Sequence, residues 1–247
     1  MSSDYTVILN GYKRPENLRF QIEAVNRQTV KPTNIFYWQN SVDGVQYDQQ
    51  AASSCVSAFC NANFGVWSRF AYALNTRTNW VCVFDDDTIP GSQWIENCLQ
   101  TYEKHPGLLG TIGLLFIPGA GYGIKERVGW DGPRDTTTQV DIVGHSWFFH
   151  RDMLSVFFRE LPPINHNYLV GEDIHFSHMI QKYTNAGTFV PPHPVSNKEM
   201  WGSLKGWELG GDKHATAGNG GIPLMYEWMQ KAVSEGFKTQ AELNGNV

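Results

Sequence analysis

The feature that most constrains this chain is an apolar segment that ends in three consecutive carboxylates. Residues 80–84 read Trp-Val-Cys-Val-Phe, a run of strand length, and Asp85, Asp86 and Asp87 follow it directly. A Pro-Gly turn signal comes shortly afterwards, so the run has the length and the boundary of a buried strand. Adjacent acids repel one another, and carboxylate oxygens are hard ligands that suit Mg²⁺ or Mn²⁺. The segment therefore predicts a divalent cation site, with a solvated acidic turn as the alternative.

A strand, a helix and a second strand precede this segment. Residues 5–10 are apolar, residues 16–28 carry apolar side chains at helical spacing, and residues 35–38 form another short apolar run. A unit of this length predicts a right-handed βαβ crossover with parallel strands. Because such sheets bind ligands at the carboxyl ends of their strands, we expect a ligand to meet four side chains there, Asn10, Tyr12, Arg14 and Asn40.

The chain length of 247 residues fits one α/β domain with two halves. A third strand at 56–61 and a helix at 66–74, which carries Arg69, would complete a nucleotide-binding half at about 1–105. An acceptor-binding half would occupy about 106–247. Its expected elements are a strand at 108–117, a Gly-rich loop at 118–134, strands at 138–143 and 147–150, a helix at 171–183, an irregular Gly-rich stretch at 198–221, a closing helix at 223–234 and a frayed end.

Two acids open the helix predicted after Gly171. Glu172 and Asp173 lie at the start of an apolar stripe with helical spacing, so they should point towards the protein body. A helix N-terminus favours ionised carboxylates. This arrangement suits a general base or a group that stabilises a cation, and simple helix capping is the alternative.

Composition narrows the classes of function. A net charge of −5 and a pI near 5.9 do not indicate a basic nucleic-acid face. The first residues, Met-Ser-Ser-Asp, do not form a secretion signal, and no apolar run reaches ~18 residues. The four cysteines lack Cys-x-x-Cys spacing, which predicts reduced thiols in a cytoplasmic protein.

The order of these motifs resembles that of the GT-A glycosyltransferases, in particular family 2 and the exostosin-like family 64. The likeness covers about residues 5–195 and includes Asn63-x-Gly65-x-x-x-Arg69. It implies a Rossmann-like nucleotide-binding sheet with helices on both faces, continuous with an acceptor-binding half. The family's DXD motif matches the acids at 85–87, and its xED motif matches Glu172 and Asp173. A late metal-binding histidine is common in the family, and His193 and His214 both qualify here.

The resemblance implies a chemistry and assigns roles. A nucleotide-sugar donor, expected to be a UDP-sugar, would bind at Asn10, Tyr12, Arg14, Asn40, Arg69, Asp85 and Asp86. Mg²⁺ or Mn²⁺ would bridge its diphosphate and Asp87, with Asp85 as a further ligand. In the inverting family 2 pattern Asp173 is the base that activates the acceptor hydroxyl. In the exostosin-like pattern configuration is retained, and the sequence leaves both outcomes open.

Two other functions and several acceptors remain open at this stage. A nucleotidyltransferase uses a related fold, although its first loop is usually richer in glycine. A carbohydrate-binding protein could use Trp147, Trp201 and Trp207 as sugar platforms. A small enzyme of this type looks like those of bacteria, phages or large DNA viruses. Its acceptor would be a glycan, a lipid-linked sugar or a hydroxymethylated base in viral DNA.

Overall fold

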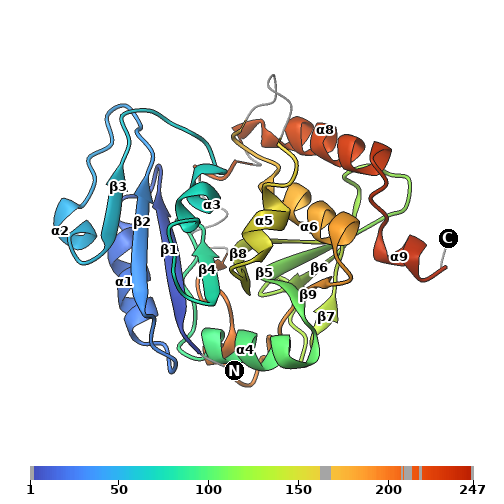
Figure 1. The fold of residues 1–247 in the computed structure, drawn as a ribbon, viewed down its shortest axis with the longest axis horizontal. Coiled ribbons are helices and arrows are strands. Elements are labelled where there is room, and N and C mark those ends of the chain that lie inside the picture. Colours follow the sequence, from blue (N-terminus) through green and yellow to red (C-terminus); the bar gives the residue numbers. More distant parts are fainter. Residues whose placement is uncertain (1–2, 162–167, 207, 209–212, 217–218, 246–247) are drawn as a thin grey trace.

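The computed structural model describes residues 3–161, 168–206, 208, 213–216 and 219–245 (Figure 1). The strands are β1 (Tyr5–Gly11), β2 (Asn34–Gln39), β3 (Val56–Phe59), β4 (Trp80–Phe84), β5 (Gly107–Phe116), β6 (Ile124–Gly129), β7 (Thr138–Gln139), β8 (Ile142–His150) and β9 (Gly187–Val190). The helices are α1 (Asn17–Asn26), α2 (Gln49–Ala52), α3 (Ser68–Ala73), α4 (Trp94–Lys104), α5 (Met153–Phe157), α6 (Glu172–Tyr183), α8 (Gly221–Ser234) and α9 (Gln240–Leu243), with a 3₁₀ helix, η1 (Lys198–Met200).

One sheet runs through the molecule in the order β3-β2-β1-β4-β8-β5-β9-β7, and β6 pairs with β5. The first four strands are parallel. The chain adds β2 and β3 on one side of β1 and then returns to place β4 on the other side. The sheet therefore has a topological switch point between β1 and β4, where ligands of open α/β sheets bind.

Helices cover both faces of the sheet, and the alternation of side chains along β1 shows how. Tyr5, Val7 and Leu9 are fully buried in a cluster with residues of α1 and α4, whereas Ile8 is buried in a second cluster with residues of α3, α5 and α6. Successive side chains of a strand point to opposite faces, so the middle of β1, residues 7–9, is apolar on both faces. The predicted α/β fold with helices on both faces is confirmed (Figure 1).

The second half continues the same sheet with antiparallel strands. β8 pairs antiparallel with β4 and with β5, and β9 lies parallel to β5 on its far side. Because β4 and β8 share a ladder, the carboxyl end of β4 lies beside the middle of β8. This junction places residues from both halves of the chain around one site.

Three local predictions were wrong. The stretch 118–134 is not only a loop, because β6 pairs antiparallel with β5. The two strands expected at 138–143 and 147–150 are instead the short β7 and a continuous β8. The frayed end holds α9, which has a capping box between Thr239 and Glu242. A carboxylate oxygen of the buried Asp141 accepts a hydrogen bond from the Gln240 backbone N–H and secures this helix to the sheet.

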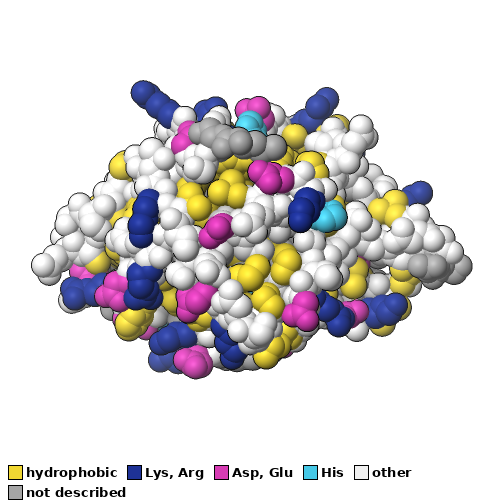
Figure 2. All heavy atoms as spheres, turned by 90° about the horizontal axis from the view of Figure 1, so that it is seen from below, with side chains coloured by type: hydrophobic (Ala, Val, Ile, Leu, Met, Phe, Trp, Pro, Cys, Tyr) yellow, Lys and Arg dark blue, Asp and Glu magenta, His cyan; other side chains and the backbone are white. Residues whose placement is uncertain are grey.

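The four cysteines are all free thiols, as predicted, and Cys82 and Cys98 are buried. None of the helices in the described part of the chain has the length and the apolar character that a bilayer crossing requires. On the face shown in Figure 2, basic and acidic side chains are interspersed, and no continuous basic strip is visible there.

Candidate active site

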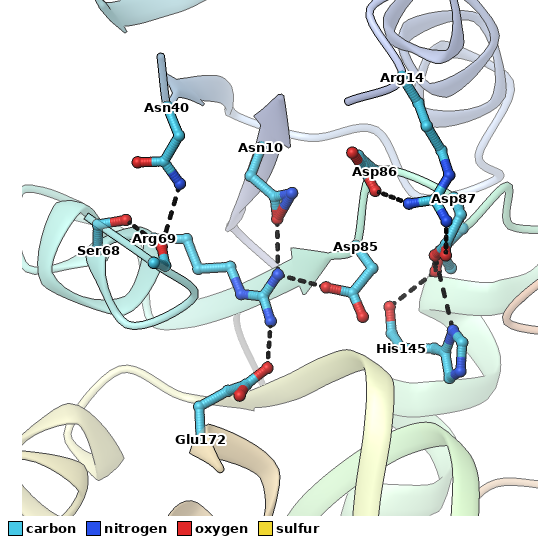
Figure 3. Close-up of polar contacts among 12 residues, drawn as sticks. Asn10, Arg14, Asn40, Ser68, Arg69, Asp85, Asp86, Asp87, His145 and Glu172 are labelled. Atoms are coloured by element: carbon cyan, nitrogen blue, oxygen red, sulfur yellow. Dashed lines mark hydrogen bonds and ion pairs between the residues drawn. The ribbon is translucent and has the colours of Figure 1, made fainter. Parts of the chain in front are cut away.

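A cavity of about 340 Å³ opens at the carboxyl ends of β1, β2 and β4 and is closed on the far side by the start of α6. It brings together most of the site residues predicted from the sequence. These are Asn10, Tyr12, Arg14, Asn40, Arg69, Asp85, Asp86, Asp87, Glu172, Asp173 and His214. The polar contacts among many of them are shown in Figure 3.

The acid triplet forms a tight turn at the end of β4. The Thr88 backbone N–H donates to the Asp85 carbonyl over 3.1 Å and closes the turn. Asp85 and Asp87 face His145, whereas Asp86 accepts a hydrogen bond from Arg14 Nη1 at 2.7 Å (Figure 3). Arg14 Nη2 also lies 3.5 Å from Asp87 Oδ2, so this guanidinium bridges Asp86 and Asp87, while Asp85 and Asp87 remain on the side of His145.

His145 completes a group of three possible metal ligands that the sequence did not indicate. It lies in a β-bulge of β8, because His145 and Ser146 stand opposite the single residue Thr111 of β5. Its backbone adopts a left-handed conformation with φ of 63°. Bulges re-aim side chains, and here Nδ1 of His145 comes 3.6 Å from Asp87 Oδ1. Ligand atoms of Asp85, Asp87 and His145 all lie within 4.8 Å of one another.

The donor set fits a divalent cation such as Mn²⁺, since two carboxylates and one imidazole combine oxygen and nitrogen ligands. Burial opposes the ionisation of Asp87, but contact with His145 and the charges of His145 and Arg14 outweigh it and hold its pKa below the ordinary value. Asp87 is therefore a carboxylate at neutral pH, as a metal ligand must be. Burial and the charge of Asp87 raise the pKa of Asp86 to about 7.

The charges around the cavity favour a cation. Five carboxyl groups line it together with three basic groups, which leaves two negative charges when all are ionised. The acids are Asp85, Asp86, Asp87, Glu172 and Asp173, and the bases are Lys13, Arg14 and Arg69. A divalent ion would offset this excess.

Arg69 joins the two halves of the site. Its guanidinium donates to Asn10 Oδ1 at 2.8 Å, to Asp85, and to Glu172 Oε1 at 2.6 Å (Figure 3). It is 3% exposed and lies over the ring of Trp147, with Cζ 4.7 Å from the ring centroid. Arg69 lines the cavity where it is predicted to meet the donor. Its hydrogen bonds to three protein side chains also hold β1, the end of β4 and the start of α6 together.

The two acids of α6 occupy different environments. Glu172 is buried and paired with Arg69. Asp173 is partly exposed to the cavity, and its Oδ1 accepts the Ile174 backbone N–H at 2.7 Å. Burial raises the pKa of Asp173 to about 6, the charge of Asp85 adds to the rise, and the Ile174 bond opposes it. Burial therefore acts against the helix N-terminus, but with a pKa of about 6 Asp173 is still mostly ionised at neutral pH.

Gly171 sets the direction in which α6 starts. Its φ of 94° is left-handed, and a Cβ there would come 2.4 Å from the ring of Trp228 in α8. Only glycine accommodates both conditions. The helix therefore begins where its first two side chains reach the cavity.

The residues expected at the nucleoside lie at the cavity edge, and one of them has a further role. Asn40 donates through Nδ2 to the Gly65 carbonyl at 3.1 Å, and its Oδ1 accepts the Phe64 backbone N–H at 3.1 Å. Asn40 thereby shapes the loop before α3. The carbonyl of Tyr12 accepts the Tyr47 hydroxyl at 2.8 Å, which fixes the loop after β1.

The two histidines proposed as late metal ligands separate in the structure. His193 is fully buried between Trp94 and Trp201. Its Nδ1 lies 2.8 Å from the Pro191 carbonyl, and its Nε2 accepts the Gly202 backbone N–H at 3.2 Å. These contacts occupy both ring nitrogens, so the assignment of His193 to the metal site is wrong. His214 is half-buried and lines the cavity.

Two of the proposed tryptophan platforms are part of the core. Trp147 is 1% exposed and Trp201 is 9% exposed, so neither offers a face to a sugar. Trp207 lies outside the described residues. The carbohydrate-binding alternative therefore loses two of its three supporting residues.

The strand order and the site at the switch point define an α/β fold of the GT-A glycosyltransferase type. No family model matches the chain, and no curated protein matches it in sequence. The structure of S. aureus TarS residues 1–349 in complex with UDP is similar, with a TM-score of 0.55 at 12% identity over 77% of this chain and 58% of that chain. The complex with UDP-GlcNAc gives 0.52 at 11% identity over 79% and 60%.

A longer TarS structure gives a TM-score of 0.53 at 12% identity, and this chain covers 35% of it. At such identities the likeness concerns the fold. This chain spans about 58% of the TarS 1–349 structure in complex with UDP.

Proposed function

We propose that this protein is a metal-dependent glycosyltransferase that moves a sugar from a UDP-sugar to an acceptor hydroxyl. The observation that carries the proposal is the convergence of Asp85, Asp87 and His145 at the switch point of a GT-A sheet, in a cavity that Asp173 also lines. UDP and UDP-GlcNAc in the TarS structures support the choice of donor.

Each part of the cavity has a role in this proposal. The carboxylates of Asp85 and Asp87 and the imidazole of His145 would hold Mn²⁺ or Mg²⁺, and His214 at the cavity edge would complete the set. The cation would offset the charge that develops on the UDP leaving group. Asp86 holds Arg14 beside Asp87, where its guanidinium would be able to meet a phosphate oxygen of the donor. Asn10, Tyr12 and Asn40 would border the nucleoside.

Asp173 would act on the acceptor. Its carboxylate takes the proton of the acceptor hydroxyl as the oxygen attacks the anomeric carbon, and the bond from that carbon to the UDP oxygen breaks. Glu172 is committed to Arg69, so Asp173 is the acid of the pair that remains available. This division of roles favours Asp173 as the base.

The charge of the cavity bears on the acceptor. With two more carboxylates than basic groups around the cavity and a net chain charge of −5, a polyanion such as DNA would be repelled. We therefore favour a glycan or a lipid-linked sugar over a modified DNA base. The cytoplasmic location and the bacterial or viral origin stay predictions.

Purified protein incubated with a panel of sugar nucleotides tests the proposal. UDP release should occur with one or more UDP-sugars in Mn²⁺ or Mg²⁺ and stop in EDTA. A nucleotidyltransferase would instead release pyrophosphate from a nucleoside triphosphate. Equal turnover in EDTA, or turnover of triphosphates alone, would contradict the proposal.

A further inference from the structure

The face of α1 that meets the acid turn carries polar side chains in the protein interior. Asn17 and Gln21 are 2% and 1% exposed, and their spacing of four residues puts them on the same face of the helix. A buried amide is costly unless it is hydrogen-bonded. The partners of these two amides therefore indicate why they are there.

Both amides donate to the backbone of the turn that carries the three acids. Gln21 Nε2 donates to the Asp85 carbonyl at 2.6 Å and to the Thr88 carbonyl at 3.1 Å. Asn17 Nδ2 donates to the Asp86 carbonyl at 2.9 Å. One amide group of Gln21 thus spans the first and the last residue of the turn.

The opposite side of the same turn is fixed by β8. The His145 carbonyl accepts the Asp85 backbone N–H at 3.0 Å and the Thr88 hydroxyl at 2.9 Å. Hydrogen bonds therefore hold the turn from two sides, from α1 and from the bulge of β8 that carries His145, the third possible metal ligand. Repulsion between the adjacent carboxylates acts to open the turn, and these bonds oppose it.

We propose that Gln21 is a positioning residue for the cation site, and that it acts by fixing the turn from which Asp85 and Asp87 project. The inference rests on the proposed function, because it assigns Gln21 a role in cation affinity. Partners that orient the ligands of a metal change its affinity by about 10–100-fold when they are removed. The same loss is expected when the two bonds of Gln21 are removed.

Gln28 offers a matched control just beyond the end of α1. It is fully buried, its Nε2 donates to the Gly91 carbonyl at 2.7 Å, and its Oε1 accepts the Ile95 backbone N–H at 3.0 Å. Like Gln21, Gln28 donates to a backbone carbonyl of the segment that joins β4 to α4, but it does so after the three acids. Gln21→Met and Gln28→Met each remove a buried amide and keep a side chain of similar size.

Titration of each purified variant with Mn²⁺ alone, followed by electron paramagnetic resonance, together with a thermal melt, tests the inference. Gln21→Met should bind Mn²⁺ about 10–100-fold more weakly than the wild type, and Gln28→Met should stay within about twofold even where its melting temperature falls equally. Unchanged Mn²⁺ affinity in Gln21→Met, or an equal loss in both variants, would overturn it.

If Gln21→Met does not fold, Asn17→Leu applies the same test through the single bond to Asp86. A loss of Mn²⁺ affinity of about threefold or more would support the inference, and an unchanged affinity would overturn it. A wild-type protein that binds no Mn²⁺ would instead contradict the proposed function itself. The two failures are therefore distinguishable.

Discussion

Replacing Arg69 with methionine should destabilise the protein strongly, whatever its reaction. The change removes the guanidinium from between Asp85 and Glu172, and it also removes the bond to Asn10. Arg69 is 3% exposed and Glu172 is 8% exposed, so the carboxylates lose their partner where water does not replace it. Removing one partner of a buried ion pair costs about 3–5 kcal/mol. For a chain of this size that predicts a melting temperature about 6–20 °C lower.

The pH dependence gives this prediction a second test. Burial raises the pKa of Asp85 and of Glu172 while Arg69 opposes the rise. Without Arg69 the folded variant binds protons more tightly than the unfolded chain, so its stability rises as the pH falls. The gap to the wild type should therefore be largest near pH 8 and smaller near pH 5.

Thermal melts at both pH values, followed by circular dichroism, would measure the effect. Arg19→Met is the control, because Arg19 pairs with Asp48 at the surface, and exposed pairs contribute little. The control should melt within about 4 °C of the wild type. If Arg69→Met melts as the control does, Arg69 does not clamp the two halves of the site.

Three further predictions concern the base and the metal site. Asp173→Asn should lower kcat about 10²-fold or more with little change in donor KM, and steady-state kinetics beside Glu172→Gln would show whether the right acid is named. Wild-type kcat should fall at acid pH with a midpoint near 6, because burial raises the pKa of Asp173 to about 6 and the base must be ionised; a pH profile without that limb would contradict the assignment. His145→Ala should weaken Mn²⁺ binding by about tenfold or more, whereas His150→Ala, at the far end of β8 beside Asp152, should not; calorimetric titration separates the two.

The sequence predicted the fold and the edge of the sheet where the site lies, because both depend on local signals. Apolar runs locate β1, β2 and β4, and the topology of parallel strands brings their carboxyl ends together. The acids at 85–87 and at the start of α6 follow apolar segments directly. Their arrival in one cavity therefore follows from element order alone.

The role of His145, the partners of Arg69 and the burial of His193 depend on how strands and helices far apart in the sequence pack together. No local sequence pattern shows this packing. His145 reaches Asp87 only because a bulge opposite Thr111 shifts β8 by one residue. In the sequence, Gly144-His145-Ser146 interrupts the apolar run, and such an interruption predicts a break between two strands and not a bulge within one. The partners of Arg69 lie as far as 103 residues away in the chain. The burial of His193 results from packing against α4 and the segment after β9, which no local pattern reveals.

In the proposed mechanism, a divalent cation held by the acid turn binds the diphosphate of the donor. Isothermal titration of UDP into the wild-type protein and into Asp87→Ala, each in Mn²⁺ and in EDTA, tests it most directly. Mn²⁺ should tighten UDP binding to the wild type by at least about tenfold and should have no such effect on Asp87→Ala. Equal UDP affinity in Mn²⁺ and EDTA for the wild type, or an unchanged effect of Mn²⁺ on the variant, would show that the acid turn holds no cation that binds the donor.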